Sequence, residues 1–296
     1  MTPRLHMTVV VPFLDEAEHL PVLLESLAAQ QRSPDRVILV DDGSSDGSSA
    51  IAQRFALDHP QARVLRRPPR PPERDRMARA HEWRAFTWGL AHVVEPWDLA
   101  AKLDADLRLT PGLLEEMEGR FLAEPRLGLA GAYLSQTLPD GRLARQRCAP
   151  GHVEGPNRFY RRACLEAISP IPAILGWDTI DEVRARMRGW ETRSFESRGG
   201  DVVHLRRLGS YDGVLRGYGR AGWAAYAYGA HPLHVLGSAA ARCRDRPRIA
   251  CGTAYLGGYA EAAVLRAARA EPEARARLRR EQRARLSALA RGRAVQ

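Results

Sequence analysis

Short apolar runs alternate with amphipathic segments along the first part of the chain, and this alternation limits the possible folds more than any other feature. The runs MTVVVPF (7–13), VILV (37–40) and RVL (63–65) are typical of buried strands. Apolar residues at helical spacing within 20–27 and 48–57 predict a helix in each interval. A repeated strand–helix–strand order predicts parallel strands joined by right-handed crossovers. We therefore expect an α/β protein with a central, mostly parallel sheet flanked by helices.

The pattern continues to about residue 135 and then becomes less regular. Asp15, with Glu18 three residues later, predicts an N-terminal cap for the first helix. The further elements that the pattern predicts are helices over 81–94, 113–122, 179–188 and 272–290, and strands over 99–103 and 127–134.

Two pairs of aspartates follow directly after predicted strands. Asp41 and Asp42 follow VILV, and Asp104 and Asp106 follow LAAKL. Because ligands of open α/β sheets bind at the carboxyl ends of the strands, we expect both pairs to face one crevice. Carboxylates there can accept hydrogen bonds from a nucleoside or hold a hard cation that neutralises a phosphate. An isolated Asp-x-Asp is more often a solvated turn, but the second pair favours a ligand site.

Basic residues are unusual in kind and in position. Of the 45 basic residues, 44 are arginines, and the exception, Lys102, precedes the second aspartate pair. A lysine kept in such a chain indicates either a place where a guanidinium does not fit or chance. The segment 266–296 holds ten arginines and three glutamates, and so carries most of the net charge of +10. A nucleic-acid-binding domain would spread such charge over its folded surface, so this function is not expected.

Taken together, the motifs resemble a known family. VVVPFLDEAEHL, VILVDDGSSDGS and KLDADL are similar in order and spacing to inverting family 2 glycosyltransferases of the GT-A fold, of the type that builds bacterial polysaccharides and other glycans. GPNRFYRR and GWDTIDEVRARMRGW resemble the acceptor-side motifs of that family. The resemblance implies a GT-A domain over 1–210, with a nucleotide-binding half (1–135) and an acceptor-binding half (136–210). A mainly helical, basic extension over 211–296 would follow.

The resemblance also implies individual roles. Asp178, twelve residues before Trp190, matches the catalytic base, although Asp181 and Glu182 are close enough in sequence to compete. Asp178 and Asp181 lie on one helix face, so an exchange of roles stays open. The residues that match the donor nucleotide site are Pro12, Asp15, Glu16, Asp41, Asp42, Arg84, Lys102, Asp104 and Asp106. Those that match the acceptor and sugar sites are Tyr160, Arg161, Trp177 and Asp181.

A metal site is the third implied feature. Asp106, Asp104 and His204 match residues that hold Mg²⁺ or Mn²⁺, although a lone histidine after a strand is more often structural. The metal would offset the charge of the leaving diphosphate while Asp178 accepts the proton of the acceptor hydroxyl. The expected donor is a nucleotide-diphosphate sugar, chiefly a UDP-sugar. The acceptor is a glycan, a lipid-linked glycan or a small molecule. A non-catalytic relative that binds nucleotide sugars and a nucleic-acid-binding protein with a basic tail are the alternatives.

Three further features bear on location and surface. Neither a signal peptide nor a spanning apolar segment is evident, and the four cysteines form no close pair, so we expect a cytoplasmic protein. The aromatic and basic segment 217–241 and the basic tail suggest either peripheral contact with the inner face of the membrane or ordinary packing. The five arginines and four prolines of 66–76 either close over a diphosphate or form an exposed linker.

Overall fold

The structure, a computed structural model, describes residues 4–69, 79–137, 141–146, 151–206 and 213–291. These residues form two compact units. The first contains the described parts of Met1–Arg74, His81–Ser169 and Arg188–Arg206, and the second those of Asp75–Ala80, Pro170–Met187 and Arg207–Gln296. The expected boundaries at residues 135 and 210 stay predictions. The helix Trp177–Met187 belongs to the same unit as the C-terminal helices.

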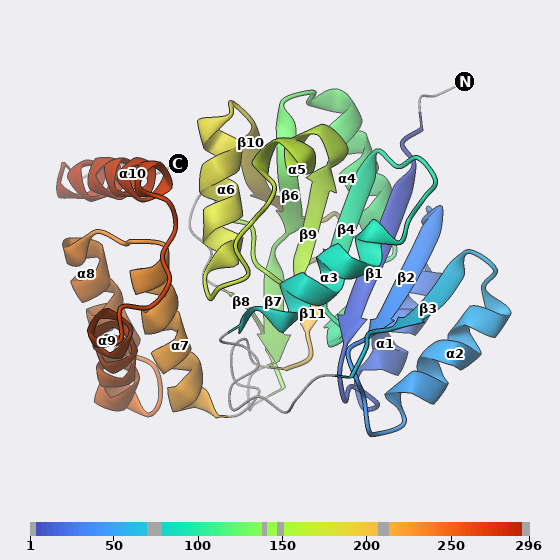
Figure 1. Cartoon of the computed structure of the whole chain (residues 1–296), viewed down its shortest axis with the longest axis horizontal. Coiled ribbons are helices and arrows are strands. Elements are labelled where there is room, and N and C mark those ends of the chain that lie inside the picture. Colours follow the sequence, from blue (N-terminus) through green and yellow to red (C-terminus); the bar gives the residue numbers. More distant parts are fainter. Residues whose placement is uncertain (1–3, 70–78, 138–140, 147–150, 207–212, 292–296) are drawn as a thin grey trace. The chain divides into compact units, whose positions relative to one another are not determined.

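A seven-stranded sheet forms the centre of the first unit (Figure 1). Its strands, in spatial order, are β10 (Glu191–Phe195), β6 (Leu127–Ala132), β9 (Asn157–Arg161), β4 (Leu99–Leu103), β1 (Met7–Phe13), β2 (Arg36–Asp41) and β3 (Ala62–Arg66). Only β9 runs antiparallel to its neighbours, and all the other pairs are parallel. The mostly parallel sheet expected from the alternating pattern is confirmed.

The two faces of this sheet bury alternate residues of β1. Val9 and Val11 pack in a core with α1 (Leu20–Ala28), α2 (Ser48–Asp58) and α4 (Leu113–Ala123). On the other face, α3 (His81–Ala91) approaches Val10 through Gly89. A Cβ on Gly89 would lie 2.5 Å from a methyl of Val40, so only glycine permits this close approach.

A second, four-stranded sheet belongs to the same unit. Its order is β5 (Leu107–Arg108), β11 (Val202–His204), β7 (Leu134–Thr137) and β8 (Leu143–Arg145). The strand predicted over 127–134 is confirmed over 127–132, but its end is wrong, because the chain leaves β6 in the large sheet and enters β7 in the small one at Leu134. The short helix α5 (Arg162–Ile168) follows β9.

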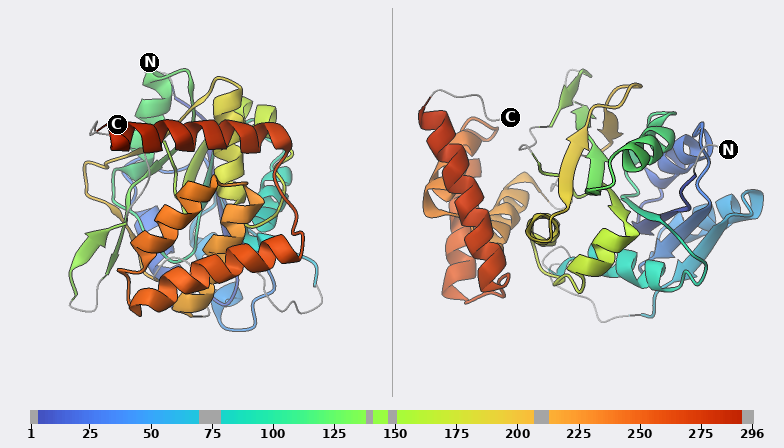
Figure 2. Two further views of the ribbon diagram at one scale, coloured as in Figure 1. Left: turned by 90° about the vertical axis from the view of Figure 1, so that its left-hand side faces the viewer. Right: turned by 90° about the horizontal axis from the view of Figure 1, so that it is seen from above.

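The second unit is helical. It contains α6 (Trp177–Met187), α7 (Val214–Ala227), α8 (Pro232–Arg242), α9 (Arg248–Val264) and α10 (Pro272–Ala290) (Figure 2). A Cβ on Gly222 would lie 1.8 Å from the Tyr255 carbonyl oxygen, and one on Gly258 would lie 1.9 Å from the Gly219 carbonyl oxygen. Helices α7 and α9 therefore touch backbone to backbone at these glycines. Helix α9 was not among the predicted helices, because its glycines weaken a helical pattern.

The aromatic residues of 217–241 take part in packing within this unit. Tyr226 meets Tyr259 edge to face at 5.7 Å, and Tyr218 donates a hydrogen bond from its hydroxyl to Asp245 at 2.7 Å. Burial raises the pKa of Tyr228 far above its usual value. Of the two alternatives for this segment, these positions favour ordinary packing and give no support to membrane contact. In the described parts of the chain, no helix has both the length and the apolar character that a membrane span requires.

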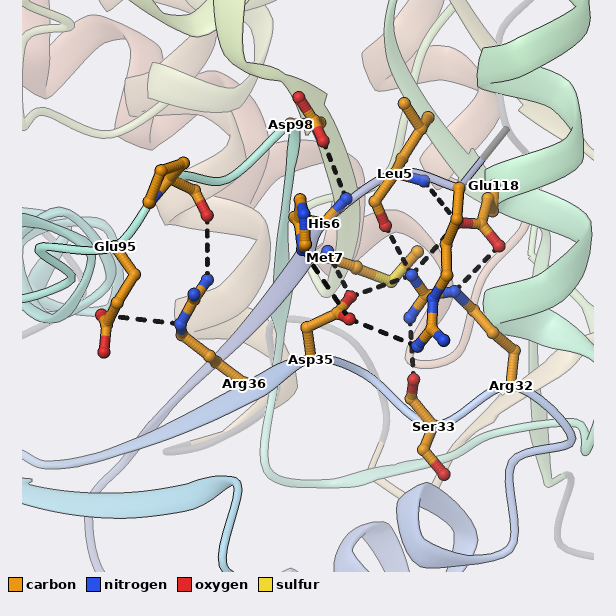
Figure 3. A network of polar contacts seen from close by, with 12 residues as sticks. Leu5, His6, Met7, Arg32, Ser33, Asp35, Arg36, Glu95, Asp98 and Glu118 are labelled. Carbon is orange, nitrogen blue, oxygen red and sulfur yellow. Dashed lines mark hydrogen bonds and ion pairs between the residues drawn. The ribbon is translucent and has the colours of Figure 1, made fainter. Parts of the chain in front are cut away.

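A network of ion pairs and hydrogen bonds around Arg32 connects the start of β1 to neighbouring segments (Figure 3). The Arg32 guanidinium lies 2.9 Å from Asp35 and 2.9 Å from Glu118. These carboxylates in turn accept hydrogen bonds from the backbone N–H groups of Met7 and Leu5, each at 2.8 Å. Burial raises the pKa of Asp35, but the bonds from Met7 and Arg32 outweigh it and hold the pKa below the usual 3.8. Asp35 therefore stabilises the fold in its charged form.

We expect Asp35→Asn to lower the free energy of unfolding at pH 7 by about 1–2 kcal/mol. Because the pKa of Asp35 is depressed in the folded chain, this contribution is present above about pH 4 and is lost as the pH falls through the folded pKa. Urea unfolding at pH 7 and at pH 3 measures it, with the exposed Asp58→Asn as control. If Asp35→Asn lowered the free energy of unfolding by the same amount at pH 7 and at pH 3, this role of the Asp35 charge would be contradicted.

Candidate active site

Three parallel strands end at one edge of the large sheet. Phe13, at the end of β1, stands opposite Asp41, at the end of β2. On the other side of β1, Val10 stands opposite Lys102, one residue before the end of β4. This register brings Asp41 and Asp42 to the same edge as Asp104 and Asp106, as the strand pattern predicted.

Asp41 organises the loop that follows β2. Its Oδ1 accepts hydrogen bonds from the backbone N–H groups of Gly43 (3.0 Å) and Ser44 (2.7 Å), and its Oδ2 accepts one from the Ser49 hydroxyl. Burial raises the pKa of Asp41, but the bonds from Ser49 and the loop amides outweigh it, so the pKa lies below its usual value. Asp41 is thus a buried, charged anchor of the loop.

Two arginines pair with these aspartates. Arg67 lies 2.6 Å from Asp42, and Arg66 lies 3.8 Å from Asp41. Both belong to the arginine-rich segment 66–76, whose residues 70–76 lie outside the described chain. The alternatives expected from the sequence were closure over a diphosphate or an exposed linker, and the pairing of Arg66 and Arg67 with aspartates was not predicted.

The turn after β1 lies against the same loop. Asp15 has a φ of 51°, and its Oδ1 accepts a hydrogen bond from the Ser45 backbone N–H at 2.7 Å. The expected helix cap at Asp15 is wrong, because α1 begins after His19 and Asp15 bridges to the β2–α2 loop instead. Pro12 is buried within β1 beside Val40.

Glu16 forms a bidentate ion pair with Arg206. Each Glu16 carboxylate oxygen lies 2.9 Å from a terminal nitrogen of the guanidinium. Burial raises the pKa of Glu16 above its usual value in spite of this partner, and the nearby charges of Asp106 and Asp104 add to the rise. Arg206 is also 4.0 Å from Asp106. Arg206 was not predicted from the sequence, where its one signal is its position two residues after His204.

Asp106 and His204 face each other across the small sheet. The antiparallel pairing of β5 with β11 places His204 opposite Leu107, and His204 Nε2 lies 3.2 Å from Asp106 Oδ2. Burial opposes the charged form of both groups, but their hydrogen bond outweighs it, lowering the pKa of Asp106 and raising the pKa of His204. Burial and the Asp106 charge raise the pKa of Asp104, although Lys102 opposes this.

The donor set at this point fits a divalent cation that arrives with further oxygen ligands. Asp106 and His204 bring a carboxylate oxygen and an imidazole nitrogen next to each other, and the buried His204 Nδ1 has no hydrogen-bond partner. Among the described residues, no three His, Cys, Asp or Glu side chains gather closely enough to hold a metal alone. Mg²⁺ commonly binds through one or two carboxylates together with substrate phosphates, which matches this partial set.

Two other residues expected in the donor site differ in exposure. Arg84 is exposed on α3. Lys102 is buried, with 1% of its surface exposed, and its ammonium pairs with Asp104 and donates to the Gly155 carbonyl oxygen at 3.0 Å. The donor contacts of both stay predictions.

Tyr160 and Arg161 lie away from this edge, and the acceptor contacts expected of them stay predictions. Tyr160 is fully buried in the middle of β9 and packs on Phe86, with ring centroids 5.9 Å apart. Arg161 stands opposite Leu99, at the start of β4. Its guanidinium donates to the carbonyl oxygens of Phe121 and Glu124 at the end of α4. Both side chains therefore take part in packing or hydrogen bonding within the first unit.

Helix α6 carries the expected base and its competitors. Asp178 is partly exposed near its start, whereas Asp181 and Glu182 are buried, at 0% and 2% exposure. Trp177 is also buried, at 4%. The Asp181 carboxylate accepts a hydrogen bond from the Glu182 backbone N–H at 2.6 Å. Of the three acids, Asp178 is thus the one with a solvent-accessible side chain, and the roles of all four residues stay predictions.

A sequence model described as "Glycosyl transferase family 2" matches residues 8–172, more than half of the chain. The chain belongs to this glycosyltransferase family. The matched residues include β1, the aspartate pairs and β9. The family expected from the motifs is therefore confirmed.

Curated relatives match a shorter stretch. The succinoglycan biosynthesis protein ExoA of Rhizobium meliloti (strain 1021) is 38% identical over 63 residues, which cover 21% of this chain and 19% of ExoA. An undecaprenyl-phosphate 4-deoxy-4-formamido-L-arabinose transferase of Pectobacterium carotovorum subsp. carotovorum (strain PC1) is 41% identical over 63 residues, covering 20% and 19% of the two chains. The match thus spans about a fifth of the length of each relative.

Solved glycosyltransferase structures share the fold. S. aureus TarS 1-349 aligns with a TM-score of 0.52 and 18% identity, over 74% of this chain and 64% of TarS. The mannosyltransferase PcManGT from Pyrobaculum calidifontis aligns with a TM-score of 0.52 and 20% identity, over 97% of this chain and 81% of its own. Together with the central sheet, these likenesses confirm the GT-A α/β fold.

We expect Asp41→Ala to lower the free energy of unfolding by about 2–3 kcal/mol, because it leaves the donors of Gly43, Ser44 and Ser49 without their acceptor. Urea unfolding measures the loss, and hydrogen exchange should show faster exchange of the amides of 43–49. Asp58→Ala, at an exposed position of α2, serves as the control. If exchange in 43–49 matched that of the control, Asp41 would not be the anchor of this loop.

Proposed function

We propose that the chain transfers a sugar from a nucleotide-diphosphate sugar, chiefly a UDP-sugar, to an acceptor hydroxyl with inversion at the anomeric carbon. The observation that carries this proposal is the convergence of both aspartate pairs at the carboxyl edge of the sheet in a chain of this family. Ligands of such sheets bind at that edge. One neighbour was solved with UDP-GlcNAc and another with GDP-Man and Mn²⁺, which supports a nucleotide sugar as the donor.

Each group at the edge has a chemical task in this proposal. Asp41 and Asp42 accept hydrogen bonds from the nucleoside, and Asp104 accepts them from the ribose. Asp106 and His204 would hold Mg²⁺ or Mn²⁺, which supplies positive charge beside the diphosphate as it leaves. This assignment is consistent with the Asp106–His204 pairing, and with the finding that the described residues form no cluster of three or more ligating side chains.

On the acceptor side, Asp178 takes the proton of the attacking hydroxyl. Its partial exposure at the start of α6 supports this choice over Asp181 and Glu182, which are buried. A single displacement by the hydroxyl inverts the anomeric centre without a covalent intermediate, so no nucleophilic side chain is needed. The acceptor is a glycan, a lipid-linked glycan or a small molecule, and the lipid-linked sugar transferase among the relatives makes the second class worth testing.

Calorimetric titration with UDP, GDP and ADP, each with and without Mn²⁺, tests the donor site directly. If one of these nucleoside diphosphates binds and its binding depends on the metal, the result supports the donor site and identifies the nucleobase of the donor. The non-catalytic alternative predicts the same binding without transfer, so a screen for sugar release must follow. The anomeric configuration of the product, measured by NMR, then decides whether transfer inverts. Absence of binding by all three nucleotides would refute the proposal.

We expect Asp106→Ala to abolish the effect of Mn²⁺ on UDP binding, because it removes the carboxylate that faces His204. A loss of about tenfold or more in affinity is reasonable for a lost metal ligand. Calorimetry of UDP with and without Mn²⁺ measures it. Glu115→Ala, an exposed position on α4, should bind like the unsubstituted chain. Binding by Asp106→Ala that still responds to Mn²⁺ would remove Asp106 from the metal site.

We expect Asp178→Asn to reduce kcat by about 10²-fold or more while donor affinity is kept, because the amide cannot accept the acceptor proton. Asp181→Asn and Glu182→Gln are the matched comparisons on the same helix. Single-turnover rates and UDP affinities of the three variants separate chemistry from binding. Full activity of Asp178→Asn, with loss in one of the others, would transfer the role of base to that residue.

A further inference from the structure

Lys102 is a buried cation in the interior of a sheet. It lies in β4, and 1% of its surface is exposed. Across the β4–β9 pair it stands opposite Arg158, which is fully buried as well. Burying a charge is costly unless the charge is paired and hydrogen-bonded. A lysine at this position therefore needs a specific partner whose interaction offsets the free-energy cost of removing the charge from water.

The partner is Asp104, two residues further along the chain. The Lys102 ammonium pairs with Asp104 Oδ1 and also donates to the Gly155 carbonyl oxygen at 3.0 Å. The Asp104 backbone N–H donates to the neighbouring Pro156 carbonyl oxygen at 2.9 Å. Side chain and backbone thus fasten Asp104 to the same short segment before β9, from two directions.

That segment is itself fixed to the sheet. Asn157, which follows it, binds both the N–H and the carbonyl oxygen of Ala132 through its side-chain amide, at 2.7 and 2.9 Å. A Cβ on Gly131 would lie 2.4 Å from the Asn157 carbonyl oxygen, so the backbones are in close contact. Lys102 therefore connects Asp104 to a rigid part of the sheet rather than to a free loop.

We propose that Lys102 is a positioning residue for the donor site, whose ammonium holds the Asp104 carboxylate in the orientation that receives the nucleotide sugar. The inference rests on the proposed function, because it takes Asp104 as a donor-binding group. It differs from a direct contact between Lys102 and the donor, since the ammonium acts through Asp104.

The single lysine makes a spectroscopic test possible. Protein labelled with [¹³C]lysine carries one labelled side chain, so the Lys102 ε-methylene gives an isolated NMR signal. Asp104→Asn removes the charge beside the ammonium and should shift this signal, whereas Asp58→Asn at an exposed site should leave it unchanged. Saturating UDP with Mg²⁺ should shift it in the unsubstituted chain. No response to Asp104→Asn would overturn the pairing, and this arm needs no substitution of Lys102.

A double-mutant cycle then tests whether Lys102 acts through Asp104. Calorimetry gives the Kd for UDP with Mg²⁺ in the unsubstituted chain, Lys102→Met, Asp104→Asn and the double variant. We expect a loss of about tenfold for Lys102→Met, and a double variant no weaker than Asp104→Asn alone, because coupled residues are not additive. Arg54→Met, an exposed cation on α2, controls for the lost charge and should bind normally.

The outcomes separate the two proposals. Additive losses in the cycle overturn the positioning role while leaving the donor site in place. Normal binding by Asp104→Asn removes Asp104 from the donor site and the positioning role with it. An unsubstituted chain that binds no nucleoside diphosphate contradicts the proposed function and this inference together, whereas non-additive losses with a responsive lysine signal support both.

Discussion

The parallel register of β1 with β2 and β4 is the constraint on which the rest of the first unit depends. It brings the two aspartate pairs, 63 residues apart in sequence, to one edge of the sheet. Because side chains alternate between the faces of a strand, a slip of one residue would exchange the core and surface sides of a whole strand. Core packing of Val9, Val11 and Leu39 therefore fixes the position of Asp41 as firmly as its own hydrogen bonds do.

Most carboxylates at this edge have a cationic neighbour. Asp42 pairs with Arg67, Glu16 with Arg206, Asp104 with Lys102 and Asp106 with His204. Buried carboxylates carry like charges, which repel each other and oppose folding. Their cationic partners therefore allow several acids to lie close together at this edge. In the proposed function the metal would arrive together with the diphosphate, and would so bring anionic ligands of its own to acids that already have cationic partners.

The sequence predicted the parallel sheet and the aspartate edge because both depend on short-range patterns. Apolar runs define the strands, and the acids follow them directly. It failed where tertiary packing overrides a local signal. Asp15 looks like a helix cap but bridges to the loop after β2, since α1 begins only after His19. The pairing of Arg206 with Glu16 was not predicted, because it joins residues 190 positions apart. Such pairings exist only once the sheet has formed.

Helix α9 shows the same limit from the opposite direction. Glycine lowers helix propensity, so a segment with several glycines gives a weak helical signal. In the second unit these glycines permit the close approach of α7 and α9 that a Cβ would prevent. The room available also explains the single lysine, Lys102. Where every other basic position holds arginine, Lys102 occupies a buried strand position between Asp104 and the Gly155 carbonyl, and a compact ammonium can turn its donors to both where a planar guanidinium needs more room. In both places the residue type follows from the space that the fold leaves. The local sequence pattern therefore gives a weak helical signal at α9, and at Lys102 it shows only an unusual residue.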